Sequence, residues 1–155
     1  MQDPTDRAGA DEPRPATDFW SVIGVNRVGD SADVASALAG VRSRLEQLGP
    51  EGVGRFLHEL DARVQGLDLG VLRSMSVEEP HVGRVPQTED GFLYARRACV
   101  LAGRRTYEGV LRDARRFSAF VHPRVHAAEC LPYLAQEVHE RMTVREADAD
   151  GDGVG

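Results

Sequence analysis

Apolar residues recur every three or four positions over long stretches of this chain of 155 residues. Residues 31–48 and 50–67 each carry such a stripe, and Gly49 and Pro50 separate them. This period places the apolar side chains on one face of an α-helix, whereas a half-buried strand needs an alternation that no segment of useful length shows. The pattern therefore predicts an all-α fold. The stripes consist of Val34, Leu38, Val41, Leu45 and Leu48, and of Val53, Phe56, Leu57, Leu60, Val64 and Leu67.

Turn and capping residues divide the rest of the chain. A first helix is predicted to start at Thr17 or Asp18, and Ser31 is expected to cap the second helix. The remaining segments are a short helical piece near 69–72, a loop at 76–89, a central helix from 90 to 102 with a continuation to 111, an irregular connector ending at Pro123, and a last helix at 127–142. We predict a compact single-domain bundle of five to seven helices over residues 17–142, with disordered polar tails at 1–16 and 143–155.

Charge is distributed unevenly along the chain, whose formal net charge is -6. Residues 96–124 contain eight arginines and two acids, a local charge of +6. Residues 45–95 contain nine acids and four arginines, a local charge of -5. Either these two parts neutralise each other in the fold, or a cationic face meets an anionic partner.

Known catalytic and metal-binding motifs are incomplete. His58 begins like the zinc-protease motif HExxH, but Ala62 stands where the second histidine is needed. The acidic tail begins like a calcium loop and lacks the glutamate that completes one. Cys130 and His126 share a helical face, yet a buried structural thiol is the preferred interpretation. We therefore expect no metal and no cofactor, and the residues leave open whether the chain is an enzyme.

The first residues are polar and acidic, which is untypical of a signal or transit peptide. No apolar run approaches the roughly 18 residues that a membrane helix needs. The two cysteines, Cys99 and Cys130, lie on apolar helix patterns and are expected to be free and buried. We therefore expect a cytoplasmic protein without a membrane partner. All nineteen basic residues are arginines, which indicates a GC-rich bacterial genome.

Short motifs are spread between Phe19 and about Met142. They are Phe19-Trp20 with Ile23, Leu67-Asp68-Leu69, Asp90-Gly91-Phe92 with Tyr94 and Arg96, Gly103-Arg104 with Tyr107 and Glu108, and a late helix with Glu129, Tyr133, Glu137 and Met142-Thr143. This set resembles a bacterial family called domain of unknown function 4240, of which the chain looks like a divergent member. Leu67, Gly70 and Ala98 stand where that family favours tryptophan. The resemblance implies a small helical domain and supplies no activity.

The shared residues suggest a polar cluster beside the core. Asp90 is expected to cap the central helix, and Tyr94, Arg96 and Arg104 are expected to converge with Asp68. Such a cluster is interpreted either as an internal arginine–aspartate network or as a notch that docks an anion or a peptide. The candidate binding residues are Trp20, Asp68, Asp90, Tyr94, Arg96, Arg104 and Tyr107.

Three functional hypotheses follow. The leading one is a non-catalytic accessory or regulatory module that binds another protein or a peptide. The alternative is a small enzyme that acts on an anionic substrate at the cluster of Asp90, Tyr94, Arg96 and Arg104, with Tyr107 as a fifth member of that neighbourhood. The third is nucleic-acid binding through the arginines from Arg112 to Arg124, which is disfavoured by an overall pI near 5.4. The oligomeric state stays open.

Overall fold

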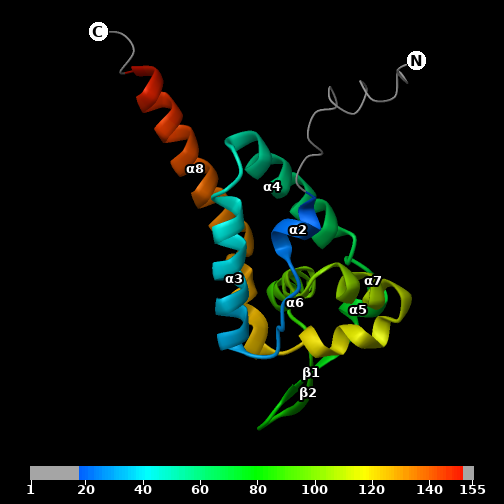
Figure 1. Cartoon of the computed structure of the whole chain (residues 1–155). Coiled ribbons are helices and arrows are strands. Elements are labelled where there is room, and N and C mark those ends of the chain that lie inside the picture. Colours follow the sequence, from blue (N-terminus) through cyan, green and yellow to red (C-terminus); the bar gives the residue numbers. More distant parts are fainter. Residues whose placement is uncertain (1–17, 152–155) are drawn as a thin grey trace, which may run out of the picture.

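Helix α6 (Glu89–Ala102) runs through the centre of the molecule, and helices from both halves of the chain pack around it (Figure 1). The structure, a computed structural model, describes residues 18–151. The other elements, in chain order, are α2 (Phe19–Ile23), α3 (Ser31–Leu45), α4 (Pro50–Gln65), α5 (Gly70–Arg73), β1 (Ser76–Glu79), β2 (Gly83–Pro86), α7 (Arg104–Arg112), the 3-10 helices η1 (Ala114–Phe120) and η2 (Pro123–Glu129), and α8 (Cys130–Gly151). The mainly helical fold predicted from the sequence is confirmed.

Helix α6 is central because its second half is apolar on every side. Ala98, Cys99, Val100 and Leu101 are consecutive and fully buried, so that part of the helix has no solvent-facing side. A helix that is apolar all round is stable only when other elements cover it completely. Here η1, η2, α4 and α7 contribute to that cover. The expected burial of Cys99 is confirmed, and Phe92 and Tyr107 are buried as well.

Helix α8 lies along α3 and α4 and extends beyond them (Figure 1). The predicted helix end at residue 142 is too early, because the helix continues to Gly151. Residues 143–149 are exposed and lack an apolar stripe, so periodicity gave no signal for this part. Arg, Glu and Ala are nevertheless good helix formers. The predicted disordered segment at 1–16 lies outside the described residues, as does 152–155. Among the described helices, none has both the length and the apolar character needed to cross a membrane.

Two connections differ from their predictions. The expected loop at 76–89 contains an antiparallel hairpin of β1 and β2, in which Val77 pairs with Val85. The turn between the strands ends at Gly83, whose φ of 89° favours glycine. The expected irregular connector before Pro123 is mostly the 3-10 helix η1, which buries Phe117 and Phe120. The fold is therefore mainly helical with one small sheet, and this corrects the expectation that no strand forms.

Helix starts largely follow the capping residues in the sequence. Asp18 caps α2, and its side chain accepts a hydrogen bond from the backbone N–H of Trp20. Pro50 occupies the first turn of α4 as predicted. For α3 the cap is Asp30, whose side chain accepts from the N–H of Asp33, and Ser31 is the first helical residue. The expected cap was therefore misplaced by one position.

A contact between two glycines holds the end of α2 against the end of α6. Gly103 has a φ of 117° and lies so close to Gly24 that a Cβ atom at Gly103 would be 2.7 Å from the Gly24 carbonyl oxygen. Asn26 strengthens this junction, since its side-chain amide donates to the carbonyl oxygens of Ile23 and Leu101 at 2.9 and 2.8 Å. The short helix α2 is thereby fixed to the core.

The two cysteines have opposite surroundings, and both are free thiols. Cys99 is buried, and burial raises the pKa of its thiol to about 12. Cys130 is exposed, which corrects the expectation that both cysteines are buried.

Burial of Cys99 predicts a loss of stability at alkaline pH. The unfolded thiol ionises from pH 9, whereas the folded thiol stays protonated until about 12, so the unfolding free energy falls over that interval. At pH 10 the loss is about 1.4 kcal/mol relative to pH 7. Urea unfolding of the wild-type protein and of Cys99→Ala at pH 7 and pH 10 measures this loss of unfolding free energy. The variant has no thiol at position 99 and should therefore lose less. Equal losses in the two proteins would contradict the assignment.

Candidate functional site

The start of α6 is capped by a residue other than the predicted Asp90. Thr88 is the cap, and its side-chain oxygen accepts a hydrogen bond of 2.9 Å from the backbone N–H of Gly91. Glu89 and Asp90 occupy the first turn, where carboxylates interact favourably with the helix dipole. Asp90 is exposed and therefore contributes to the helix start rather than to a buried site.

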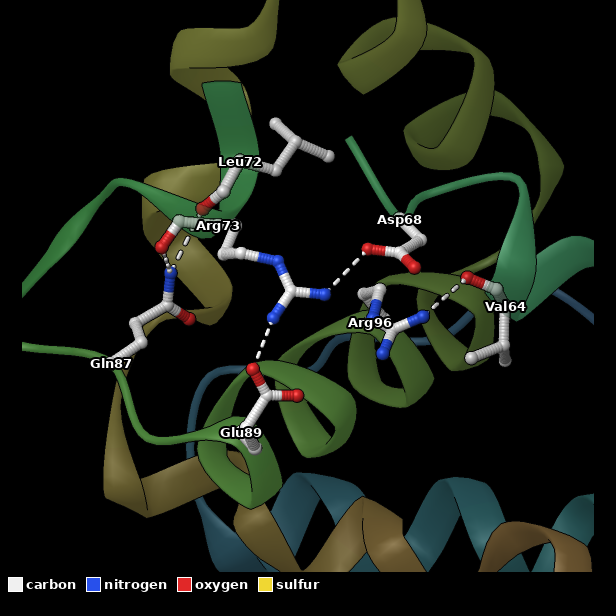
Figure 2. A network of polar contacts seen from close by, with 7 residues as sticks. All are labelled: Val64, Asp68, Leu72, Arg73, Gln87, Glu89 and Arg96. Atoms are coloured by element: carbon white, nitrogen blue, oxygen red, sulfur yellow. Dashed lines mark hydrogen bonds and ion pairs between the residues drawn. The ribbon is translucent and has the colours of Figure 1, made fainter. Parts of the chain in front are cut away.

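The cluster of Asp68, Arg73, Glu89 and Arg96, which we call the arginine cluster, joins the loop after α4 to α5 and α6 (Figure 2). Arg73 donates to Asp68 at 2.8 Å and also to Glu89. The guanidinium carbons of Arg73 and Arg96 lie 4.9 and 4.5 Å from the centre of the Phe92 ring. Hydrogen bonding with Arg73 lowers the pKa of Asp68, which therefore remains ionised.

Arg96 is the buried member of the arginine cluster, with only 9% of its surface exposed. Its Nη1 donates to the carbonyl oxygen of Val64 at 3.2 Å, whereas its Nε has no hydrogen-bond partner among the described residues. Burial lowers the pKa of Arg96, and the nearby charge of Asp68 acts in the opposite direction. Arg96 thus connects the end of α4 to α6. Its positive charge also interacts favourably with the carboxylate of Asp68, which lies in the loop between α4 and α5.

Gln87 ties the same region to the segment before α6 (Figure 2). Its side-chain amide donates to the carbonyl oxygens of Leu72 and Arg73, at 2.8 and 3.2 Å. These bonds satisfy carbonyl groups at the end of α5, which has no further turn of helix to accept from them. The cluster and Gln87 together fix α5 against α6, so the arrangement acts as a structural network at the surface, with Arg96 as its buried member.

The predicted convergence of Tyr94, Arg96, Arg104 and Asp68 is only partly right. Arg96 and Asp68 are electrostatic neighbours in the arginine cluster. Tyr94 instead packs edge-on against His126, with ring centres 5.4 Å apart, and hydrogen bonding with Glu129 raises the pKa of its hydroxyl. No hydrogen bond or ion pair within residues 18–151 joins any two of Asp90, Tyr94, Arg96, Arg104 and Tyr107. The five side chains therefore do not form one site.

Trp20 and Tyr107 are mainly core residues. Their ring centres are 5.2 Å apart, and 9% of Trp20 and 4% of Tyr107 is exposed. The Tyr107 hydroxyl donates to the carbonyl oxygen of Arg63 at 3.0 Å, and burial raises its pKa. Arg63 also places its guanidinium 5.6 Å from the centre of the Trp20 ring. This group fixes α2 and α7 to the end of α4.

Sequence reasoning missed Arg73, Glu89 and Gln87 as members of the polar network. Arg73 follows Asp68 by five residues across a short helix, and this proximity was the available signal for their pairing. The contacts of Glu89 and Gln87 form because the hairpin brings the residues that follow it back to α5. The spacing of residues in the sequence does not predict this tertiary arrangement.

A groove between the end of α2 and the start of α7 brings together two predicted binding residues, Trp20 and Arg104. Its volume is about 480 Å³. We call it the α2–α7 groove, and it is lined by Asp18, Trp20, Ser21, Gly24, Val25, Arg104, Arg105, Glu108 and Arg112. Arg104 forms an ion pair with Glu108, in which Nε and Oε1 are 3.0 Å apart. The groove contains more cationic than anionic side chains.

The exposed arginines Arg104, Arg105, Arg112 and Arg116 form what we call the arginine face. Arg116 belongs to η1 but lies against α7, because a Cβ atom at Gly109 would be 2.9 Å from its Nη1. Within the described chain, only Arg104 of these four forms an ion pair. The neighbouring Arg115 is paired with Asp113 at 3.0 Å. Phe117 and Phe120 are buried beneath this surface as core anchors.

These observations define a small, mainly helical protein with a polar network that joins α5 to α6 and an exposed arginine face. The chain belongs to the family described as Protein of unknown function (DUF4240), whose model matches residues 15–141. The resemblance seen in the sequence is thereby confirmed. Searches of the curated proteins and of the solved structures found no match to the chain.

Several motif residues of the family resemblance have structural roles here. Gly103 permits the close contact with Gly24, and Phe92 supports the two guanidinium groups of the arginine cluster. Arg104 and Glu108 pair across one turn of α7. These contacts favour the interpretation of the shared residues as a structural network.

Proposed function

We propose that this protein is a non-catalytic accessory or regulatory module that binds another protein or a peptide through its arginine face. The observation that carries the proposal is the exposure of Arg105, Arg112 and Arg116 on one side of α7 without ion pairs to described residues. Guanidinium groups recognise carboxylates through paired hydrogen bonds, and arginine is enriched at protein interfaces. A solvated cluster of like charges is a surface that an anionic partner stabilises.

The surroundings of the enzyme candidates also support a binding role. Arg96 and Tyr107 use their polar groups to bond backbone carbonyls of α4, and Arg104 is paired with Glu108. A catalytic set has to bring its acid, base and anion-binding groups to one reacting atom. The five side chains of the enzyme alternative are instead distributed over separate contacts.

Co-purification tests the proposal. The tagged full-length protein is isolated from a lysate of the cells that naturally make it, and a stoichiometric protein partner is expected. The double variant Arg112→Glu with Arg116→Glu should lose this partner. The matched variant Arg84→Glu with Arg145→Glu changes the same charge elsewhere on exposed residues and should retain it. Recovery of only the free protein at high concentration would contradict the proposed function.

We further propose that the module acts in the cytoplasm of a bacterium. The two free thiols support a reducing compartment, since disulfides form mainly in oxidising ones. The exclusive use of arginine among the basic residues supports a bacterial genome rich in GC.

Nucleic-acid binding is a second candidate function because Arg112, Arg116 and Arg124 are all exposed. Its signature is salt dependence. If the four arginines from Arg112 to Arg124 neutralise phosphates, the logarithm of the binding constant should fall with the logarithm of salt concentration with a slope of about -3 to -4. Fluorescence anisotropy of labelled DNA and RNA measures it. The absence of binding at low ionic strength would exclude this function.

A further inference from the structure

The α2–α7 groove includes apolar residues in an otherwise charged lining. Val25, which follows the end of α2, is 92% exposed, and the buried Trp20 belongs to the same lining. The contact between Gly24 and Gly103 and the two bonds donated by Asn26 hold the segment of Val25 in place. An apolar side chain that covered Val25 would remove apolar surface from water without any rearrangement of the protein.

The rim of the groove is cationic. Arg105 and Arg112 are two helical turns apart and line the same side of α7. The ion pair of Arg104 with Glu108 uses Nε and leaves the two terminal amino groups of that guanidinium for other acceptors. Arg116 adds a fourth positive charge beside α7 at Gly109. The lining itself has three arginines against two carboxylates, those of Asp18 and Glu108.

We infer that the α2–α7 groove is the docking site for an acidic segment of the partner protein, with an aliphatic side chain over Val25 and carboxylates on Arg105 and Arg112. This inference rests on the proposed function and specifies the partner's chemistry. Charge complementarity favours an anion, and the exposed valine in the same lining favours one that carries apolar side chains. A nucleic-acid backbone has no aliphatic side chain that would cover Val25.

The test uses the intrinsic fluorescence of Trp20, which is the only tryptophan in the chain. A synthetic peptide of glutamates around one central leucine is titrated into the full-length protein, and a saturable change in the Trp20 emission is expected. Two further peptides separate the contributions. Replacing leucine by serine, or glutamate by glutamine, should weaken binding about tenfold in each case.

Matched protein variants locate the site. Arg105→Glu is expected to weaken peptide binding about tenfold or more, whereas Arg84→Glu makes the same charge change on the hairpin and should leave the affinity within about twofold. Val25→Ser should remove the preference for the peptide that carries leucine. Both Arg84 and Arg105 are exposed, so neither change disturbs the core.

Four results would overturn the inference. The first is that the peptide does not bind at all, and the second is that Arg105→Glu and Arg84→Glu weaken binding equally. The third is tighter binding of an oligo-dT strand than of the peptide. The fourth is a change in Trp20 emission on removal of residues 1–16 without added peptide, which would identify the chain's own acidic segment as the occupant.

The outcome for the groove is distinguishable from the outcome for the proposed function. If a natural partner co-purifies with the wild-type protein and equally with Arg105→Glu, the groove assignment fails while the binding role stands. If no partner is found, the proposed function fails.

Discussion

Replacing Gly103 by alanine is expected to destabilise the protein by about 3 kcal/mol or more, because two costs combine at this position. The backbone has a φ of 117° and a ψ of 174°, a region that residues with a Cβ atom rarely adopt. The new Cβ would also lie 2.7 Å from the carbonyl oxygen of Gly24, which is backbone and cannot rotate away. Relief of this contact requires α2 to separate from the end of α6.

Thermal and urea unfolding measure this loss, and a melting temperature lowered by roughly 6–12 °C is expected for a chain of this size. Gly54→Ala provides the matched control, because Gly54 is inside α4 and its added Cβ would have only one neighbour, at an ordinary 3.9 Å. The control should be stabilised by about 0.5–1 kcal/mol, since alanine is the better helix former. A Gly103→Ala protein as stable as the wild type would show that the glycine contact is not a constraint.

Replacing Arg96 by alanine should cost about 3 kcal/mol of unfolding free energy. The substitution removes the stem that packs on Phe92, leaves the Val64 carbonyl oxygen without its donor, and takes a positive charge away from Asp68. Arg96 itself is only 9% exposed, so water poorly replaces its packing and its hydrogen bond, whereas Asp68 is exposed and contributes less.

Arg96→Met separates packing from charge in this prediction. Methionine keeps an unbranched stem of similar reach, so about half of the stability should return while the hydrogen bond to Val64 stays lost. Urea unfolding of the three proteins gives the comparison. If Arg96→Ala unfolds at the same urea concentration as the wild type, the interpretation of the arginine cluster as a structural network is wrong.

The parts of the fold that could be predicted are those with a one-sided apolar stripe. Helices α3 and α4 were predicted from their periodicity, and Pro50 marked the start of the second one. The hairpin was missed because each strand has four residues and only Val77 and Val85 are half-buried, so no alternation becomes visible. The extension of α8 beyond Met142 was missed because it is stabilised by helix propensity without an apolar face.

The candidate site was less predictable than the fold because its contacts join distant segments. Asp68 and Arg96 were correctly expected to be neighbours. The bonds of Arg73 to both Asp68 and Glu89 were not expected, because they depend on how α5 and the hairpin position these segments. Arg104 was assigned to the same cluster because it is one of the residues shared with the family. Gly103 ends α6, however, and the new direction of α7 takes Arg104 to the α2–α7 groove.

The hairpin has a consequence for the behaviour of the protein in concentrated solution. In the described chain β1 and β2 pair only with each other, so the outer edge of each strand presents unsatisfied backbone groups that could recruit strands from other molecules. Pro86 has no N–H to offer such a strand, and the opposed charges of Glu78 and Arg84 must stay hydrated. Proline and charged side chains, rather than burial, therefore protect the exposed edges of this hairpin against aggregation through added strands.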